Sequence, residues 1–280
     1  MVKSHYDWSD ANNLPFLQSH SLEKHEIFKN SFSNFLRKAA SKRPETTLTI
    51  VDGFCGGGVY KSSENGVEIH GSPFIFLEKI GKIESIIRAK RGANFRINAM
   101  YYFVDRDANA IKTLKSQLYK MGYGKLIGDR IFLLRGSFSK NLPFLLKMLE
   151  QRNGHSFFLL DQYGYKDAPL PLIKQIFAKI TNSQVMLTFA KDAMINYIAN
   201  TDDFRKCVAY SNTGKTLLTD KEIGKTINLK NSKNYYKWRA ELESKLLHRI
   251  VKISGAKTCD YYSVKSASSH RTFWLLNLFA

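Results

Sequence analysis

The chain has 280 residues and is 44% hydrophobic, so it can bury a sizeable core as one large domain or as two small ones. Its 43 lysine and arginine residues outnumber its 24 acidic residues, and the resulting net charge of +19 indicates a polyanionic partner, most commonly nucleic acid, either DNA or RNA. A basic surface that only keeps the protein soluble is the alternative, and the lack of an apolar run of about 18 residues excludes a membrane-spanning helix.

The three cysteines are few and widely spaced, which predicts a reducing compartment without a metal or redox site. They are Cys55, Cys207 and Cys259. Because residues 1–13 are polar and carry no apolar segment of a secretory signal, we expect a cytoplasmic protein. Cys55 lies in a glycine-rich turn, where a small packed residue is a simpler interpretation than a nucleophile.

Residues 1–45 are predicted to form an N-terminal leader and one helix. Trp8 stands in the polar leader, residues 1–19, which we expect to be docked or partly ordered. Ser21 is the candidate N-cap of the helix, and apolar side chains follow it at three- and four-residue spacing, which predicts an apolar stripe facing the core. The stripe consists of Ile27, Phe28, Phe32, Phe35, Leu36 and Ala39.

The rest of the chain is organised around the stretch that follows this helix. Residues 47–51 are apolar on both faces, as is typical of a buried parallel strand, and the strand ends in Asp52. The glycines at 56, 57 and 58 permit a tight turn and the close approach of a ligand to the backbone. In a doubly wound α/β sheet, ligands bind at this end of the first strand, although such a turn is often only a turn.

A loop and a helix are expected after this glycine bend. The polar residues 61–70 predict a loop, and Gly71-Ser72-Pro73 then opens a helix in which proline takes a position that needs no N–H. The next strand, residues 99–104, again ends in an acid, Asp105. In nucleotide-binding sheets such an acid accepts hydrogen bonds from ribose hydroxyls, with Asp107 or a plain helix cap as the alternatives for this position.

Two further strands complete the predicted edge of the site. Residues 130–134 form the third strand, and Ser137 follows it where an adenine would lie. Residues 156–160 form the fourth strand, which is followed by Asp161 and the flexible aromatic segment 162–165. We expect Asp52, Asp105 and Asp161 to lie along one rim of the sheet around an open glycine bend.

The remaining pieces complete one α/β domain over residues 1–280. They are a helix at 169–179, a strand at 184–189, a helix at 235–251, and a hairpin of residues 258–264 and 272–279. Residues 191–234 are predicted to be an insertion near a substrate groove. The pattern predicts a doubly wound, mostly parallel seven-stranded methyltransferase-like (Rossmann-type) sheet with a C-terminal antiparallel hairpin.

These motifs, in this order, resemble the bacterial three-Cys-motif partner proteins, a methyltransferase-like family. The resemblance covers residues 20–280 and rests on Lys24-His25-Glu26, Val51-Asp52-Gly53-Phe54, Gly56, Gly58-Val59-Tyr60, Gly71-Ser72-Pro73, Phe103-Val104-Asp105, Phe158-Leu159-Leu160-Asp161, Tyr163-Gly164 and the tyrosine-rich hairpin. It implies S-adenosylmethionine as cofactor and a partner protein with a three-cysteine motif. The chain differs from related families at Gln162, where a proline usually follows the acid, and at Cys55-Gly56-Gly57, where Ala-Gly-Pro is more frequent.

The resemblance and the acidic strand ends together predict a set of site residues. We expect the cofactor to contact Lys24, His25, Asp52, Phe54, Gly56, Gly58, Asp105 and Ser137. Lys24 could instead meet a phosphate or be a solvated helix charge. Asp161 and Tyr163 are the predicted catalytic residues, because the acid would accept a hydrogen bond from a target amine and the ring would stack on a flipped base.

The leading hypothesis is methyl transfer from S-adenosylmethionine to an exocyclic amino group of a nucleic-acid base. The alternative is a catalytically altered protein of the same fold that binds nucleic acid or a partner protein, for example in a bacterial defence or mobile-element system. In that case Asp161-Gln162 would mark the lost chemistry, because glutamine adds a donor and flexibility where proline fixes the loop. Nucleotide processing on the same sheet is a third possibility.

Overall fold

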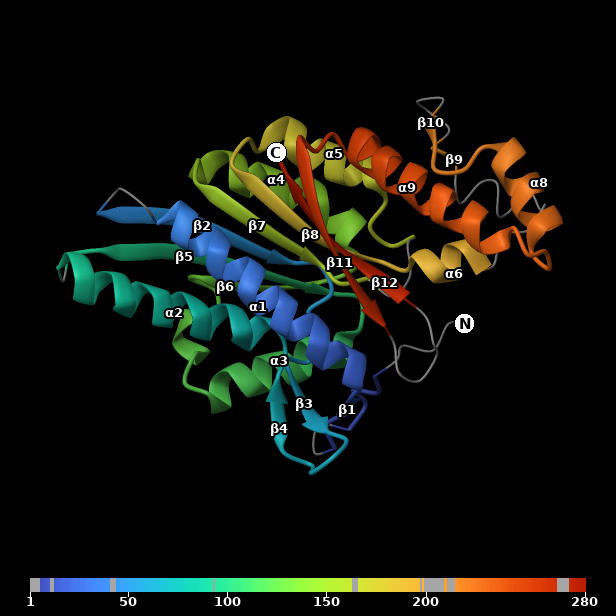
Figure 1. Cartoon of the computed structure of the whole chain (residues 1–280). Helices are drawn as coiled ribbons and strands as arrows, with labels where there is room; N and C mark the ends of the chain where they lie inside the picture. The colour runs from blue at the N-terminus through green and yellow to red at the C-terminus, as the bar shows by residue number, and fades with distance from the viewer. Residues whose placement is uncertain are drawn as a thin grey trace.

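The computed structural model describes residues 6–10, 13–40, 44–92, 94–162, 166–196, 198, 209–210, 215–265 and 272–280. Its main feature is a seven-stranded sheet with the strand order β11-β12-β8-β7-β2-β5-β6. These strands are β2 (Glu45–Asp52), β5 (Arg96–Asp105), β6 (Ile131–Arg135), β7 (His155–Leu160), β8 (Ser183–Phe189), β11 (Thr258–Lys265) and β12 (Thr272–Phe279). Figure 1 shows the sheet running through the centre of the molecule.

The pairing of the strands confirms the predicted fold class. The pairs β2–β5, β2–β7, β5–β6 and β7–β8 are parallel, whereas β12 runs antiparallel to both β8 and β11. The central strand β2 lies between β5 and β7, so that Asp52 is in register with Phe103 on one side and Leu159 on the other. The carboxyl ends of the parallel strands therefore meet at one edge, where doubly wound sheets bind ligands.

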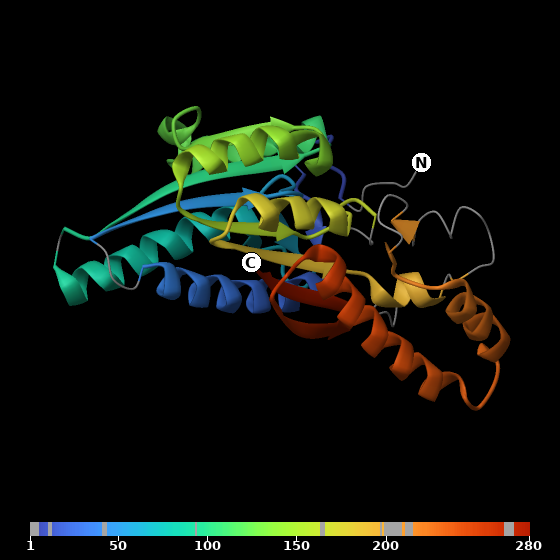
Figure 2. The same cartoon turned by 90° about the horizontal axis from the view of Figure 1, so that it is seen from above.

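Helices cover both faces of the sheet (Figure 2). The helices α1 (Ser19–Ala39), α2 (Ser72–Arg91) and α3 (Ala108–Lys120) contribute to one hydrophobic cluster. The helices α4 (Phe138–Arg152), α5 (Leu170–Lys179) and α9 (Tyr235–Ser254) contribute to the other. No helix in the described part of the chain combines the length and the apolar character needed to span a membrane.

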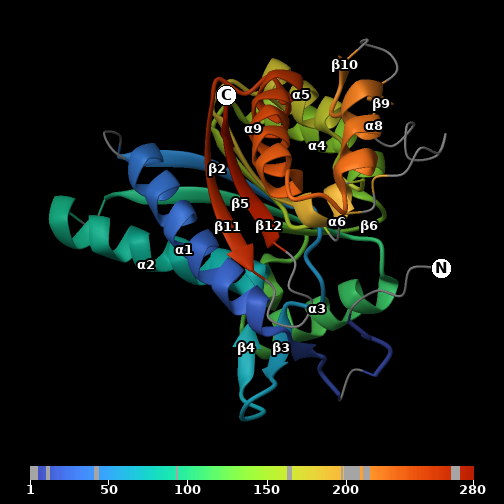
Figure 3. The ribbon, with the colours of Figure 1, turned by 45° about the vertical axis from the view of Figure 1, so that its right-hand side comes forward.

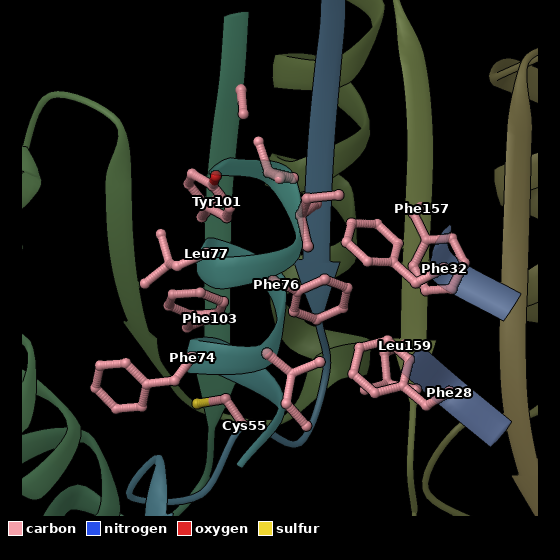
Figure 4. Close-up of a cluster of buried hydrophobic side chains, with 14 of the residues drawn as sticks. Phe28, Phe32, Cys55, Phe74, Phe76, Leu77, Tyr101, Phe103, Phe157 and Leu159 are labelled. Atoms are coloured by element: carbon pink, nitrogen blue, oxygen red, sulfur yellow. The ribbon is translucent and has the colours of Figure 1, made fainter. Parts of the chain in front are cut away.

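Aromatic rings fix α1 and α2 on the sheet (Figure 4). The ring centroids of Phe32 and Phe76 lie 4.8 Å apart, and those of Phe32 and Phe157 lie 5.0 Å apart, both in edge-to-face arrangements. Phe28 adds a second edge-to-face contact with Phe76 at 4.8 Å. Since such pairs add about 0.5–1.5 kcal/mol beyond area burial, the predicted stripe on α1 holds the start of this helix beside the carboxyl edge of the sheet.

Several boundaries differ from the sequence-based predictions. α1 begins at Ser19 with Gln18 as its N-cap, so Ser21 lies inside the first turn and is buried rather than a cap. Residues 61–70 were expected to be a loop, but they belong to a hairpin of β3 (Val59–Ser62) and β4 (Glu68–His70), and β1 (Phe16–Leu17) pairs with β3. Backbone pairing orders this polar segment despite its composition.

The chain between β8 and α9 lies beside the carboxyl edge of the sheet (Figure 3). Its described elements are α6 (Lys191–Asn196), the short strands β9 (Ala209–Tyr210) and β10 (Lys215–Thr216), and α8 (Asp220–Leu229). A short 3-10 helix (Gly124–Leu126) follows α3 elsewhere in the fold. The predicted insertion at 191–234 thus contains regular structure, and α8 together with the start of α9 extends beyond the sheet (Figure 2).

Candidate functional site

A cavity of about 250 Å³ lies at the carboxyl edge of the sheet. It is lined by the leader, by the first turns of α1, by the glycine bend and by the acids that follow β5 and β7. The lining residues are Tyr6, Trp8, Leu17, Gln18, Ser21, Lys24, His25, Phe54, Gly56, Tyr60, Ser72, Asp105, Asp107, Asp161 and Gln162. Of the predicted site residues, the structure therefore brings Lys24, His25, Phe54, Gly56, Asp105 and Asp161 together around one space.

The glycine bend is closely packed by two rings of the protein itself. Gly56 has a φ of +57°, and a Cβ at this position would lie 2.6 Å from the Tyr60 hydroxyl. A Cβ on Gly57 would lie 2.3 Å from the ring of Trp8, so this glycine makes room for the leader. The bend is therefore open to the cavity at Gly56 and covered at Gly57, which only partly matches the open bend that we expected.

Gly58 lies away from the cavity. Its φ is +81°, and a Cβ there would meet Leu114 at 2.6 Å and Phe74 at 2.9 Å. Its carbonyl oxygen accepts a hydrogen bond of 2.7 Å from the N–H of Gly71. Gly58 therefore shapes the turn into β3 and α2, and it is not among the residues that line the cavity.

Asp105 connects the second strand to the glycine bend. Its Oδ2 accepts the N–H of Gly56 at 2.9 Å, and its Oδ1 accepts the N–H of Asp107 at 2.9 Å. Burial raises the pKa of Asp105 against these two hydrogen bonds. The neighbouring Asp107 is the N-cap of α3, where it accepts the N–H of Asn109 at 2.8 Å, so the helix-cap interpretation applies to Asp107.

Asp52 is completely buried beneath the bend. Its Oδ1 accepts the N–H of Phe54 at 3.2 Å. Burial raises the pKa of Asp52 to about 7 despite opposing hydrogen bonds from Ser72 and Phe54, and the charges of Asp161 and Asp105 raise it further. The three acids thus lie within electrostatic reach of one another, as predicted, but Asp52 supports the bend from below and does not line the cavity.

Asp161 is held by a lysine and a hydroxyl. The Lys24 ammonium donates to both carboxylate oxygens, at 2.7 and 2.8 Å, and the Thr188 hydroxyl donates to Oδ1 at 2.5 Å. Burial raises the pKa of Asp161, but the Lys24 charge and these hydrogen bonds outweigh it and hold the pKa below its usual range. Because the Lys24 side chain is only 14% exposed, Lys24 is not a solvated helix charge.

His25 faces the same cavity as a neutral side chain. Burial lowers its pKa to about 4, and the nearby negative charge of Asp161 only partly opposes this shift. Its Nδ1 is buried and has no hydrogen-bond partner among the described residues. An unsatisfied polar atom beside a cavity is costly, and a ligand group that bonded to it would remove that cost.

The Gln162 side chain forms three hydrogen bonds to backbone groups after β7 and in β8. Its side-chain oxygen accepts the N–H groups of Asp167 and Ala168, both at 2.9 Å, and its Nε2 donates to the Thr188 carbonyl at 3.2 Å. The side chain is buried, with 3% exposed. The amide thus ties Gln162 to β8 and to the start of the described segment 166–196, while residues 163–165 lie outside the described residues and the expected flexibility there stays a prediction.

Two further sequence predictions, Ser137 and the described part of 191–234, fall outside the cavity. The Ser137 hydroxyl caps α4 by accepting the N–H of Lys140 at 3.3 Å, and Ser137 does not line the cavity. Tyr163 lies outside the described residues. None of the described residues in the range 191–234 lines this cavity. Cys55 is buried, and burial raises the pKa of its thiol, which fits a packed residue and not a nucleophile.

Some residues of the site carried no recognisable sequence signal. Trp8 and Tyr6 come from a leader without periodicity, and Trp8 packs edge-to-face on Tyr60 with ring centroids 5.2 Å apart. Thr188 stands inside an apolar strand, where a threonine is ordinary. The isolated Trp8 in a polar leader was the one signal behind the expected docking, and Trp8 is buried in the structure. The described residues contain no cluster of side chains that could hold a metal ion.

No protein-family model matches the chain, and no curated protein matches it either. Solved structures that are similar include the METTL16 methyltransferase domain lacking its N-terminus, at 9% identity and a TM-score of 0.39, covering 90% of this chain and 82% of that one. The methyltransferase domain of bacterial CtHen1-C has 10% identity, a TM-score of 0.38 and coverages of 90% and 96%. Aeropyrum pernix fibrillarin with natively bound S-adenosyl-L-methionine has 6% identity, a TM-score of 0.38 and coverages of 88% and 73%. At these TM-scores the fold assignment rests on the strand order.

Proposed function

We propose that the chain is an S-adenosylmethionine-dependent methyltransferase that acts on an exocyclic amino group of a nucleic-acid base. One observation carries the proposal. Asp161 presents a carboxylate at the cavity beside Gly56 and Asp105, and a nitrogen donor, the Lys24 ammonium, is bound to both of its oxygens. An amine at this position would find an acceptor that is held in its charged form.

The residues around the bend fit the proposed cofactor. When bound, S-adenosylmethionine supplies an electrophilic methyl group on a sulfonium cation. Asp105 and Asp107 add negative charge to the cavity, and each carboxylate oxygen of Asp105 retains a lone pair for a ribose hydroxyl after its backbone hydrogen bond. Gly56 lines the cavity, and the buried Nδ1 of His25 has no partner among the described residues, which a ligand could provide.

The size of the cavity limits how much of the cofactor it encloses. Its volume of about 250 Å³ lies just below the range of roughly 300–1,000 Å³ that is common for small-molecule sites. The part held between Gly56 and Asp161 would therefore be enclosed, and the rest would extend beyond the mouth. Trp8 and Tyr6 form the wall on the side of the leader.

The protein's own contribution to the reaction would be to position the acceptor. An aromatic amine is a weak nucleophile because its lone pair is delocalised, so alignment of its nitrogen supplies much of the rate gain. Asp161 would accept one N–H of the amine once the amine has replaced Lys24, and Thr188 would keep the carboxylate oriented. We assign the stacking of the target base to Tyr163 as part of the same proposal.

The partners follow from charge and from family resemblance. The net charge of +19 favours a nucleic-acid substrate, and the resemblance to three-Cys-motif partner proteins favours an associated protein with that motif. Both assignments are part of the proposal.

One observation favours the second candidate, a protein of the same fold that binds nucleic acid or a partner without catalysis. Asp161 is already engaged by Lys24 and by Thr188, so an amine must break a close ion pair before it can be oriented. A protein that had lost the chemistry could keep this pair permanently.

Methyl transfer to nucleic acid separates the two candidates. Mixed DNA and RNA are incubated with the protein and methyl-labelled S-adenosylmethionine, and the digested nucleosides are identified by mass spectrometry. We expect a label on a base amine that falls at least 100-fold in Asp161→Ala, because the variant loses the acceptor that orients the amine. Asp129→Ala removes an exposed acid elsewhere and serves as the control with unchanged activity. An unlabelled product pool from the wild-type protein would favour the non-catalytic candidate.

A further inference from the structure

A second charged feature stands beside the site and is not used by the proposed chemistry. We call residues 220–245 the basic arm; it comprises α8, the turn after it and the first half of α9. The arm extends beyond the carboxyl edge of the sheet (Figures 2 and 3), and residues at this edge line the cavity. Its lysines are Lys221, Lys225, Lys230, Lys233, Lys237 and Lys245.

Most of these lysines have no acidic partner. Among the described residues, Lys221, Lys225, Lys233, Lys237 and Lys245 form no ion pair, and all five are exposed. Of the four acids in the arm, Glu222 pairs with Arg249 at 2.6 Å and Glu243 pairs with Lys191 at 2.6 Å. The six lysines and Arg239 outnumber these acids, which also include Asp220 and Glu241, by three. The arm therefore concentrates uncompensated positive charge.

Two of the lysines lie over the buried ring of Trp238, and an exposed tyrosine lies nearby in the sequence. The Lys225 ammonium lies 4.0 Å from the centroid of the Trp238 ring, and the Lys245 ammonium lies 5.2 Å from the same ring. A groove runs between the two helices and is lined by Lys225, Leu229, Asn234, Lys237, Trp238 and Glu241. At the tip, the Tyr236 side chain is 81% exposed. Clustered ammonium groups beside an exposed ring are the two components of a single-stranded nucleic-acid surface.

The base of the arm is tied to the strand that orients Asp161. Lys191 follows β8 directly, three positions after Thr188, and its ammonium lies 2.6 Å from a carboxylate oxygen of Glu243 on α9. Arg239 of α9 binds Asp192 at 2.6 Å, and Asp192 also accepts the N–H of Thr272 at 2.7 Å. These contacts hold the arm at a fixed position beside the carboxyl edge.

We infer that the basic arm binds single-stranded nucleic acid, with its lysines on the phosphates and Tyr236 stacked on a base. The inference builds on the proposed function, since it names the surface that holds the substrate while a base reaches Asp161. An anionic membrane is less suited to the arm, because the apolar side of α9, with Leu242 and Leu246, is buried in the core and leaves no apolar face to insert.

The test compares two double charge reversals of equal net charge. Lys233→Glu/Lys237→Glu alters the arm without touching the lysines that lie over Trp238. Lys82→Glu/Lys90→Glu alters two exposed lysines of α2 that form no ion pair among the described residues. Binding of a fluorescent single-stranded oligonucleotide is followed by anisotropy over a range of salt concentrations, without any methyl donor. Thermal melting checks that both variants fold.

We expect the arm variant to bind at least tenfold more weakly than the wild-type protein and the α2 variant to bind within about threefold of it. Two lost phosphate contacts should also lower the slope of log affinity against log salt by about 1.4, at roughly 0.7 per contact for single strands. Tyr236→Ala should weaken binding at least fivefold with an unchanged slope, because stacking releases no counterions.

Equal losses in the two double variants would overturn the inference, because the charge of the whole molecule would then be responsible. Failure of the wild-type protein to bind the oligonucleotide, or arm-dependent binding to phosphatidylserine vesicles alone, would also overturn it. Because the assay contains no methyl donor, it measures binding independently of catalysis. Arm-dependent binding here, together with no label in the methyl-transfer experiment, would refute the proposed function and leave the inference intact.

Discussion

At the scale of single residues, the central feature is the pair formed by Lys24 and Asp161. Burial alone would raise the pKa of Asp161 and favour its neutral form, which accepts hydrogen bonds poorly. Lys24 reverses this shift while occupying the position of a donor. The same lysine therefore keeps the acid charged and competes with any amine that approaches it.

Replacing Lys24 should change the pH dependence of methyl transfer. In Lys24→Met the pKa of Asp161 rises, because burial is no longer opposed by the ammonium. Asp161 must be ionised to accept an amine hydrogen, so activity falls as the pH drops through its pKa, and the acid limb of kcat/KM should move to higher pH than in the wild-type protein. The profile is measured with oligonucleotide substrate.

A control on the same helix distinguishes this effect from a general change in charge. Lys29→Met removes a lysine that pairs with Glu26 at 2.7 Å, and it should leave the acid limb in place. An acid limb that does not move in Lys24→Met would show that ionisation of Asp161 does not govern the reaction.

At the scale of elements, the leader and the glycine bend form one packed unit. Trp8 is buried with 5% exposed, and its ring occupies the space that a side chain at position 57 would need. The leader thus forms a wall of the cavity, and Gly57, the second of the three consecutive glycines, serves this packing and not the cofactor. If the packing of Trp8 on Gly57 were lost, the wall that the leader forms on this side of the cavity would be lost too.

Two glycine-to-alanine substitutions should have effects of opposite sign on stability. In Gly57→Ala the new Cβ would lie 2.3 Å from the buried Trp8 ring, so we expect a loss of about 1–3 kcal/mol in the free energy of unfolding. Gly81 lies inside α2 with no atom within 4 Å of a built Cβ, so Gly81→Ala should gain up to about 1 kcal/mol from helix propensity. Urea denaturation measures both. A neutral Gly57→Ala would contradict the docking of Trp8 on the bend.

At the scale of the whole molecule, the centre of the sheet could be predicted from the sequence because the strands β2, β7 and β8 are buried on both faces. The apolar runs that end at Asp105 and just before Asp161 show no helical period. Each run stops at an acid, and the structure shows both runs as parallel strands. The apolar stripes on the helices α1 and α9 could be predicted from the sequence in the same way. These patterns depend on local periodicity, which a single sequence contains.

The contacts that define the cavity could not be predicted in the same way. Lys24 and Asp161 are separated by 137 positions, and nothing in either segment identifies the other as its partner. The hairpin β3–β4 was missed because its strands are short and polar and are fixed by pairing with each other and with β1. The hydrogen bonds of the Gln162 side chain likewise depend on backbone groups at 167, 168 and 188, which only the fold brings together.

The most direct measurement of the central claim is calorimetric titration of S-adenosylmethionine and its demethylated product into the wild-type protein. We predict measurable binding of both, at least tenfold weaker in Asp105→Ala and unchanged in Asp129→Ala, because Asp105 lines the cavity whereas Asp129 is an exposed acid elsewhere. No heat from either compound at high protein concentration would contradict the assignment of this cavity to a sulfonium nucleoside.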